Sequence, residues 1–92
     1  MPCSYTRLDV SIIVLGVLRH IHNLPSITEA TIFGPQGLNV DDTFKSSYYN
    51  PIKMSVEKPD CILKNFSTSD CINASTVGDI VDAVWADFDP NG

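Results

Sequence analysis

A long hydrophobic run is absent from the sequence. The longest apolar stretch, Val10–Leu18, has nine residues and is interrupted by Ser11 and Gly16, whereas a membrane-spanning helix needs roughly 20 apolar residues. The stretch has the length of a signal-peptide core, but Asp9 precedes it where such a peptide is basic, and His20-Ile21-His22 is a poor cleavage region. We therefore predict that it is a buried element of a cytoplasmic protein with no membrane partner.

Basic residues are scarce, since 6 Lys and Arg stand against 11 Asp and Glu and give a net charge of −5. Such a balance repels phosphate backbones, so we expect no nucleic-acid partner. It favours protein partners that offer Lys and Arg patches. The 92 residues, 43% of them hydrophobic, have room for one core. We predict a single domain over 1–92 whose ends, 1–7 and 89–92, are flexible.

Cysteine is also scarce, and Cys3, Cys61 and Cys71 do not have the spacing of a metal site. A Cys61–Cys71 bridge would fit an oxidising compartment, whereas three reduced thiols would fit a cytoplasmic protein, and we expect the reduced thiols. Two triplets, Asn65-Phe66-Ser67 and Asn73-Ala74-Ser75, match the glycosylation pattern. Together with that bridge they define an alternative class, a small secreted disulfide domain.

The sequence offers no constellation of catalytic or metal-binding residues. On a helix, the side chains of its two histidines, His20 and His22, would point about 200° apart, which prevents both from facing one metal. No Cys-His or Ser-His nucleophile is visible locally, and Gly34-Pro35-Gln36-Gly37 lacks the Lys-Ser/Thr of a phosphate-binding loop. Asp41, Asp42 and the acidic residues near the C-terminus are expected to be solvated. We predict no metal, no catalytic residue and no enzymatic activity.

Helical periodicity, in contrast, is plentiful. Thr6 and Asp9 have the spacing of a capping box, in which each residue bonds the other's backbone amide. Apolar residues then recur at helical spacing from Leu8 to Leu24 until Pro25 ends the pattern. We predict a long first helix here, although the β-branched Ile12-Ile13-Val14 would also suit a buried strand.

A long connection follows the first helix. Residues 25–43 are rich in turn formers, and within them Ile27–Phe33 is expected to be a short strand or an irregular packed segment. Next, Asn50-Pro51 is typical of an N-cap followed by proline at the first helical position. It predicts a second helix that runs to about Lys58 and is ended by Pro59. This helix would bury two residues spaced four apart, Ile52 and Val56.

Two further capping boxes open the last two helices. Ser67 and Asp70 predict a single turn that buries Ile72, and Thr76 and Asp79 predict a final helix. The final helix has one apolar face, formed by Val77, Ile80, Val81, Val84 and Phe88 with Trp85 at its edge. Its acidic residues point mostly to the other side, namely Asp79, Asp82 and Asp87. We therefore predict an all-α fold, a small four-helix bundle with a long loop after the first helix.

This outline resembles the acyl carrier and peptidyl carrier protein fold. Residues 76–84 resemble the start of a carrier's last helix, which a Thr-Val pair opens. Phe66 stands ten residues before Thr76, where carriers have an apolar residue ahead of their third helix. Val40-Asp41-Asp42-Thr43-Phe44 resembles the segment before their second helix. The resemblance covers about residues 40–88 and is close over 76–84.

The resemblance implies a phosphopantetheine arm on the serine of a Gly-x-Asp-Ser-Leu motif at the start of the second helix. Counting back from Thr76 makes Ser47 the nearest candidate for attachment and Ser46 the runner-up. The Gly is absent, Ser46 replaces the Asp and Tyr48 replaces the Leu. An exposed hydroxyl at a helix N-terminus, beside free amides, would suit the phosphodiester.

The implied function is that of a divergent carrier, which tethers an acyl or aminoacyl group for synthase, transferase or ligase enzymes. The alternative is a carrier-like fold without the arm that acts as a protein-interaction module. The missing Asp-Ser-Leu favours the second function, and the acidity of the chain fits both.

Overall fold

Helices make up the regular structure of the computed structural model, which describes residues 3–89. In this part of the chain there are five helices and no strand: α1 (Arg7–His22), α2 (Asp42–Ser46), α3 (Tyr49–Val56), α4 (Thr68–Asn73) and α5 (Val77–Ala86). The four predicted helices are α1, α3, α4 and α5, and α2 is an additional short helix at the end of the long connection. None of the described helices is long and apolar enough to cross a membrane.

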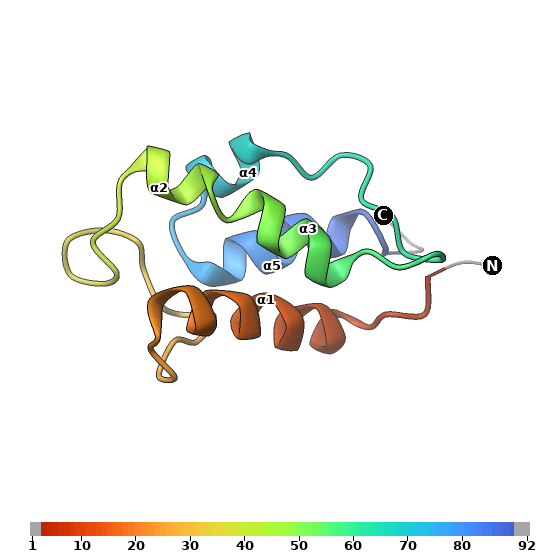
Figure 1. Cartoon of the computed structure of the whole chain (residues 1–92), viewed down its shortest axis with the longest axis horizontal. Coiled ribbons are helices and arrows are strands. Elements are labelled where there is room, and N and C mark those ends of the chain that lie inside the picture. Colours follow the sequence, from red (N-terminus) through yellow and green to blue (C-terminus); the bar gives the residue numbers. More distant parts are fainter. Residues whose placement is uncertain (1–2, 90–92) are drawn as a thin grey trace.

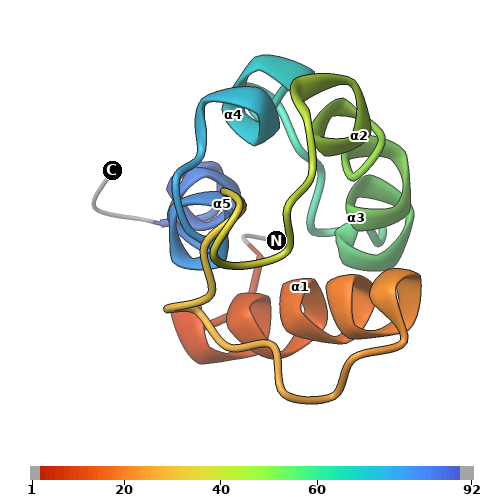
Figure 2. The same ribbon diagram turned by 90° about the vertical axis from the view of Figure 1, so that its left-hand side faces the viewer.

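The helices surround a single core. α1 runs along one side of the molecule and packs against both α3 and α5 (Figure 1). Viewed end-on, α3 and α5 stand on opposite sides above α1, and α2 and α4 lie together on the side away from it (Figure 2). The largest fully buried side chains of this core include Tyr48, Leu18, Ile27, Ile52 and Ile80.

Helix α1 confirms the first predicted helix and its cap. Thr6 Oγ1 accepts a hydrogen bond from Asp9 N–H at 3.1 Å, and the Asp9 carboxylate accepts one from Thr6 N–H at 2.9 Å. The helix ends at His22, because Asn23 adopts the left-handed conformation of a helix C-cap with φ 51°. Three residues of its inner face are fully buried, Val10, Val14 and Leu18. The strand alternative for 12–14 is therefore wrong.

Helices α4 and α5 begin at the predicted caps. Thr76 Oγ1 accepts a hydrogen bond from Asp79 N–H at 3.3 Å, and the Asp70 carboxylate accepts one from Ser67 N–H at 2.9 Å. The predicted apolar face of α5 is buried, namely Val77, Ile80, Val81, Val84 and Phe88. In α4 the fully buried residue is Cys71 rather than the predicted Ile72. Cys71 is the fourth residue of this short helix, the position that packs with the residue before the cap.

The predicted N-cap of the second helix is wrong. Helix α3 begins at Tyr49, and its N-cap residue, Tyr48, already has helical backbone angles, φ −69° and ψ −23°. Tyr48 N–H donates to Lys45 O at 3.1 Å, so α2 leads almost directly into α3 and no side-chain cap forms. Asn50 and Pro51 lie inside the first turn, where the missing amide of proline is still tolerated. Two residues of α3 are fully buried as predicted, Ile52 and Val56.

The connection after α1 is irregular rather than a strand. Its one ladder contact is an isolated antiparallel bridge between Ile32 and Thr76. Two carbonyls of the connection cap the start of α5: Thr31 O accepts a hydrogen bond from Val77 N–H at 3.0 Å, and Glu29 O accepts one from Gly78 N–H at 2.8 Å. Residues 27–33 are therefore the packed irregular segment that the sequence left as one alternative.

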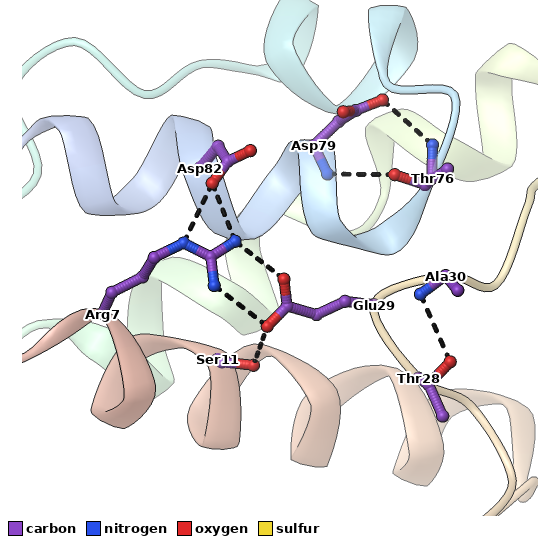
Figure 3. A network of polar contacts seen from close by, with 8 residues as sticks. All are labelled: Arg7, Ser11, Thr28, Glu29, Ala30, Thr76, Asp79 and Asp82. Carbon is purple, nitrogen blue, oxygen red and sulfur yellow. Dashed lines mark hydrogen bonds and ion pairs between the residues drawn. The ribbon is translucent and has the colours of Figure 1, made fainter.

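A polar network fastens this segment to α1 and α5 (Figure 3). The Arg7 guanidinium donates to both carboxylate oxygens of Glu29, at 2.7 and 3.1 Å, and to Asp82 at 2.8 and 3.0 Å. Ser11 Oγ donates to Glu29 at 2.6 Å. The hydrogen bond from Arg7 holds the pKa of Glu29 below its usual range. Because these charges are partly exposed, the network orients the segment more than it stabilises the fold.

Both cysteine interpretations made from the sequence are wrong. Cys3 and Cys61 form a disulfide, with a Cα–Cα distance of 4.9 Å, and Cys71 is free and buried. The bonded cysteines are 58 residues apart. No local pattern joins residues at such a separation, so the sequence did not indicate this pairing, in place of which we expected three reduced thiols or, as the alternative, a Cys61–Cys71 bridge. The pairing comes from the fold.

The segment before α1 is anchored, in contrast to the predicted flexible start over 1–7. Besides the disulfide at Cys3, the Tyr5 hydroxyl donates to Val56 O at 2.9 Å. The ends predicted to be flexible, 1–7 and 89–92, lie partly outside the described residues, since the structure does not describe 1–2 and 90–92.

Candidate functional site

The two candidate serines lie at the junction between α2 and α3. Ser46 is the last residue of α2 and Ser47 is its C-cap. Ser46 Oγ donates to Thr43 O at 2.7 Å, and Ser47 Oγ donates to Phe44 O. Both hydroxyls are thus turned back onto α2. Ser47 is exposed whereas Ser46 is half-buried, so Ser47 offers the more accessible hydroxyl.

The free amides that we expected beside these serines are engaged. Ser47 N–H donates to Phe44 O at 3.0 Å and Tyr48 N–H donates to Lys45 O at 3.1 Å. This follows from the direct passage of α2 into α3, which supplies helical carbonyl partners to the amides ahead of α3. A phosphate on Ser47 would therefore lie near the positive end of the α3 dipole without these two amides as donors.

An aromatic cluster, consisting of His22, Phe33, Phe44 and Tyr48, fixes the junction from the inside. Tyr48 is fully buried, and its ring centroid lies 5.6 to 5.7 Å from those of the other three. His22 Nε2 and the Tyr48 hydroxyl share a hydrogen bond. Burial raises the pKa of Tyr48 to about 12 and lowers the pKa of His22. A neutral phenol and a neutral imidazole therefore hold the end of α1 against the start of α3.

Lys45 is a buried residue next to the candidate site, and the sequence did not indicate its role. The residue is only 8% exposed, and Nζ donates to Ala74 O, the C-cap carbonyl of α4, at 2.7 Å. Nζ also lies 5.2 Å from the centroid of the Phe33 ring. Lysine is almost never buried, and no sequence pattern singled out this one. It ties α2 to the end of α4 and so holds the junction from a second side.

An open apolar groove of about 490 Å³ lies between α1 and α3. Its wall on α1 is partly exposed, with Ile12 61% exposed, and Met54 on α3 is 83% exposed. At Gly16, also in the groove, a Cβ atom would meet nothing within 4 Å. The groove can receive an apolar group, and it begins on α3 at Pro51, four residues after Ser47.

The acidic residues of the last helix are less free than predicted. The Asp79 carboxylate accepts hydrogen bonds from Ser75 and Thr76 N–H at 2.9 and 3.1 Å, which hold its pKa below the usual range. Asp82 pairs with Arg7. Asp87 accepts hydrogen bonds from three consecutive amides, those of Lys64, Asn65 and Phe66. Asp79 and Asp82 are exposed, as a solvated face requires, and Asp79 makes the predicted capping box. The sequence did not indicate the long-range partners of Asp82 and Asp87.

Metal ligands do not gather in the described part of the chain, where no group of three or more His, Cys, Asp and Glu residues is placed to hold an ion. His20 is exposed, and His22 lies in the aromatic cluster. The free thiol of Cys71 is fully buried, and burial raises its pKa to about 12. A thiol in this state is a poor nucleophile.

Comparisons with protein-family models, curated proteins and solved structures gave no match to this chain. The resemblance to carrier proteins therefore rests on the sequence motifs alone.

Proposed function

We propose that this domain is a divergent carrier protein that holds an acyl or aminoacyl group on a phosphopantetheine arm at Ser47. One observation carries the proposal: the exposed Ser47 directly precedes Tyr48, which is fully buried. The Ser-Leu pair of a carrier motif implies the same alternation, a hydroxyl in solvent and an apolar anchor in the core. Ile52, one turn further along α3, is also fully buried and keeps this orientation fixed.

In this proposal the chain positions the arm and performs no chemistry itself. The arm's thiol would carry the thioester, and the aromatic cluster and Lys45 would keep its anchor rigid. Asp41 and Asp42, exposed at the start of α2, place negative charge beside the junction. They suit partner synthases, transferases or ligases that present Lys and Arg patches.

A second candidate is a carrier-like fold without the arm that acts as a protein-interaction module. Two observations favour it. Residue 46 is Ser where carriers have Asp, and the Ser47 hydroxyl already donates to Phe44 O.

The two candidates differ in whether Ser47 is modified. We would incubate the protein with coenzyme A and a broad-specificity phosphopantetheinyl transferase, and then measure its intact mass. The carrier proposal expects one added phosphopantetheine on the wild type and on Ser46→Ala, and none on Ser47→Ala. Ser55→Ala, which removes an exposed serine of α3, is the matched control and should be modified like the wild type.

Other outcomes contradict the proposal. An unchanged mass for the folded wild type would favour the interaction module. A modification that survives Ser47→Ala and is lost in Ser46→Ala would move the arm to the runner-up residue. A modification that survives both substitutions would remove both serines from the site.

A further inference from the structure

A second surface hollow, of about 340 Å³, lies at the start of α1, and Ser4, the neighbour of the disulfide-bonded Cys3, is part of its lining. The hollow is lined by Ser4, Tyr5, Asp9, Ile12, Ile13 and Lys58. It shares Ile12 and Ile13 with the apolar groove between α1 and α3. The segment before α1 and the turn after α3 lie at the same end of the molecule (Figure 1). Ser4, Tyr5 and Lys58 from these two segments form a wall of the second hollow, next to the groove.

Few polar and ring contacts hold the 3–5 segment in place. The Tyr5 hydroxyl donates to Val56 O at 2.9 Å, and Lys58 Nζ lies 4.5 Å from the centroid of the Tyr5 ring. The Tyr5 ring also packs edge-on against Phe88, with centroids 5.7 Å apart. The Cys3 and Tyr5 side chains also pack, half-buried, against the core. A hydrogen bond and ring contacts are each weak, so the covalent bond at Cys3 is the strongest single restraint on the segment.

We propose that the Cys3–Cys61 disulfide is a redox-sensitive clamp that keeps the 3–5 segment in the wall of the second hollow, where that hollow meets the α1–α3 groove at Ile12 and Ile13. Cys3 is half-buried and Cys61 is fully buried, so a dithiol reductant reaches Cys3. A thiolate of the reductant attacks Cys3 Sγ and forms a mixed disulfide with it. Cys61 leaves as a thiolate and takes up a proton. The second thiol of the reductant then displaces Cys3 and completes its own disulfide, so that two electrons pass to the protein.

Reduction releases the wall while the bundle stays folded. The capping box of Thr6 and Asp9 belongs to α1 and does not depend on the disulfide. Once Cys3 and Tyr5 move away, Ile12 and Ile13 lose one side of their hollow and Phe88 loses its ring contact. The groove then extends to the end of the bundle and exposes a larger apolar surface. Cys71 takes no part, because it is fully buried.

Hydrogen exchange of oxidised and dithiothreitol-reduced protein tests the clamp. The amides of Lys58 and Cys61 donate hydrogen bonds to each other's carbonyls. On reduction their protection against exchange should fall on the order of tenfold or more, because the free energy of ordering one residue's backbone corresponds to about that factor in the opening equilibrium. Amides in the middle of α1 and α5 should keep their protection. Binding of the apolar dye anilinonaphthalene sulfonate should rise in the same sample. Thiol titration after denaturation, with one free thiol before reduction and three after it, verifies the two states.

Matched variants distinguish a local restraint on the 3–5 segment from a disulfide that stabilises the whole fold. Cys3→Ser in non-reducing buffer should reproduce the reduced pattern, and Cys71→Ala should keep the full redox response. If Cys3→Ser does not fold, reduced wild type makes the same comparison. Equal loss of protection throughout the chain would overturn the proposal, because the disulfide would then stabilise only the whole fold. Unchanged exchange and dye binding on reduction would overturn it too, because the non-covalent contacts would suffice.

Discussion

His22 at the end of α1 and Tyr48 at the start of α3 share a hydrogen bond between the imidazole Nε2 and the phenol oxygen. The two rings also meet edge to face, with centroids 5.7 Å apart. Tyr48 follows Ser47 directly, so the same contact that joins two helices also fixes the backbone that carries the candidate attachment residue. The stability of this junction therefore depends on the protonation state of His22.

Burial of His22 makes the fold sensitive to mild acid. Its folded pKa is lowered from the ordinary value of 6.5 by burial, so the unfolded chain takes up the proton first as pH falls. The contribution to stability is complete above pH 6.5 and declines as pH falls from there toward the lowered folded pKa. We expect the free energy of unfolding, measured with urea, to fall between pH 7.5 and pH 5.5 in the wild type. Replacement His22→Gln should flatten this part of the profile.

His20 is the matched control for this titration because it is exposed on the same helix. His20→Gln should retain the decline seen in the wild type. A decline that persists in His22→Gln and disappears in His20→Gln would assign the pH dependence to the wrong histidine and contradict the prediction.

The buried ammonium of Lys45 should contribute more to the free energy of unfolding than an exposed lysine does. Lys45→Met keeps most of the apolar stem but leaves Ala74 O without its donor, and should lower the free energy of unfolding by about 1–3 kcal/mol. Lys45→Ala also opens a cavity and should cost about 2–5 kcal/mol. Lys64→Ala, at an exposed lysine, should stay within about 0.5 kcal/mol of the wild type. Equal unfolding midpoints for Lys45→Ala and Lys64→Ala in urea would refute a structural role for Lys45.

The pairing of Arg7 with Glu29 should give a measurable but salt-dependent coupling. In a double-mutant cycle with Arg7→Ala and Glu29→Ala, we expect an interaction free energy of about 0.5–1 kcal/mol at low ionic strength, because the pair is bidentate but partly exposed. In 1 M NaCl the coupling should shrink, since the Debye length is then about 3 Å. A coupling that does not respond to salt would show that packing, rather than charge, joins the two residues.

The caps and the apolar faces explain why so much of the fold was predictable. The boxes opened by Thr6, Ser67 and Thr76 act within one turn, so four residues of sequence contain the whole interaction. The apolar face of α5 likewise follows from helical spacing alone. The start of α3 was not predicted because the preceding helix, rather than a side chain, caps it: Lys45 O accepts a hydrogen bond from Tyr48 N–H. The helix α2 was not predicted because its N-cap, Asp41, was not recognised. Its signal was present, because Asp41 accepts a hydrogen bond from Phe44 N–H at 2.8 Å, an ordinary N-cap.

The candidate site was less predictable because its contacts are long-range. Ser47 could be selected from a motif, but its aromatic support from His22 and Phe33 joins segments that only the fold brings together. The same holds for the Cys3–Cys61 disulfide. A charged side chain such as Lys45 gives no local sign that it will be buried, because its partner is a backbone carbonyl that any residue provides.

Two glycines of the loop ahead of α2 provide the sharpest test of local backbone structure. A Cβ atom on Gly37 would lie 2.0 Å from Ile32 O, and that carbonyl accepts a hydrogen bond from Leu38 N–H at 2.9 Å. Gly37→Ala must therefore displace backbone and break this bond, and should lower the free energy of unfolding by about 2 kcal/mol. At Gly34 a Cβ atom meets nothing within 4 Å. Gly34→Ala should be neutral or stabilising by about 0.4–1 kcal/mol, because it restricts only the unfolded chain. Thermal unfolding of both variants measures the contrast, and equal midpoints would show that the loop does not hold Gly37 against Ile32.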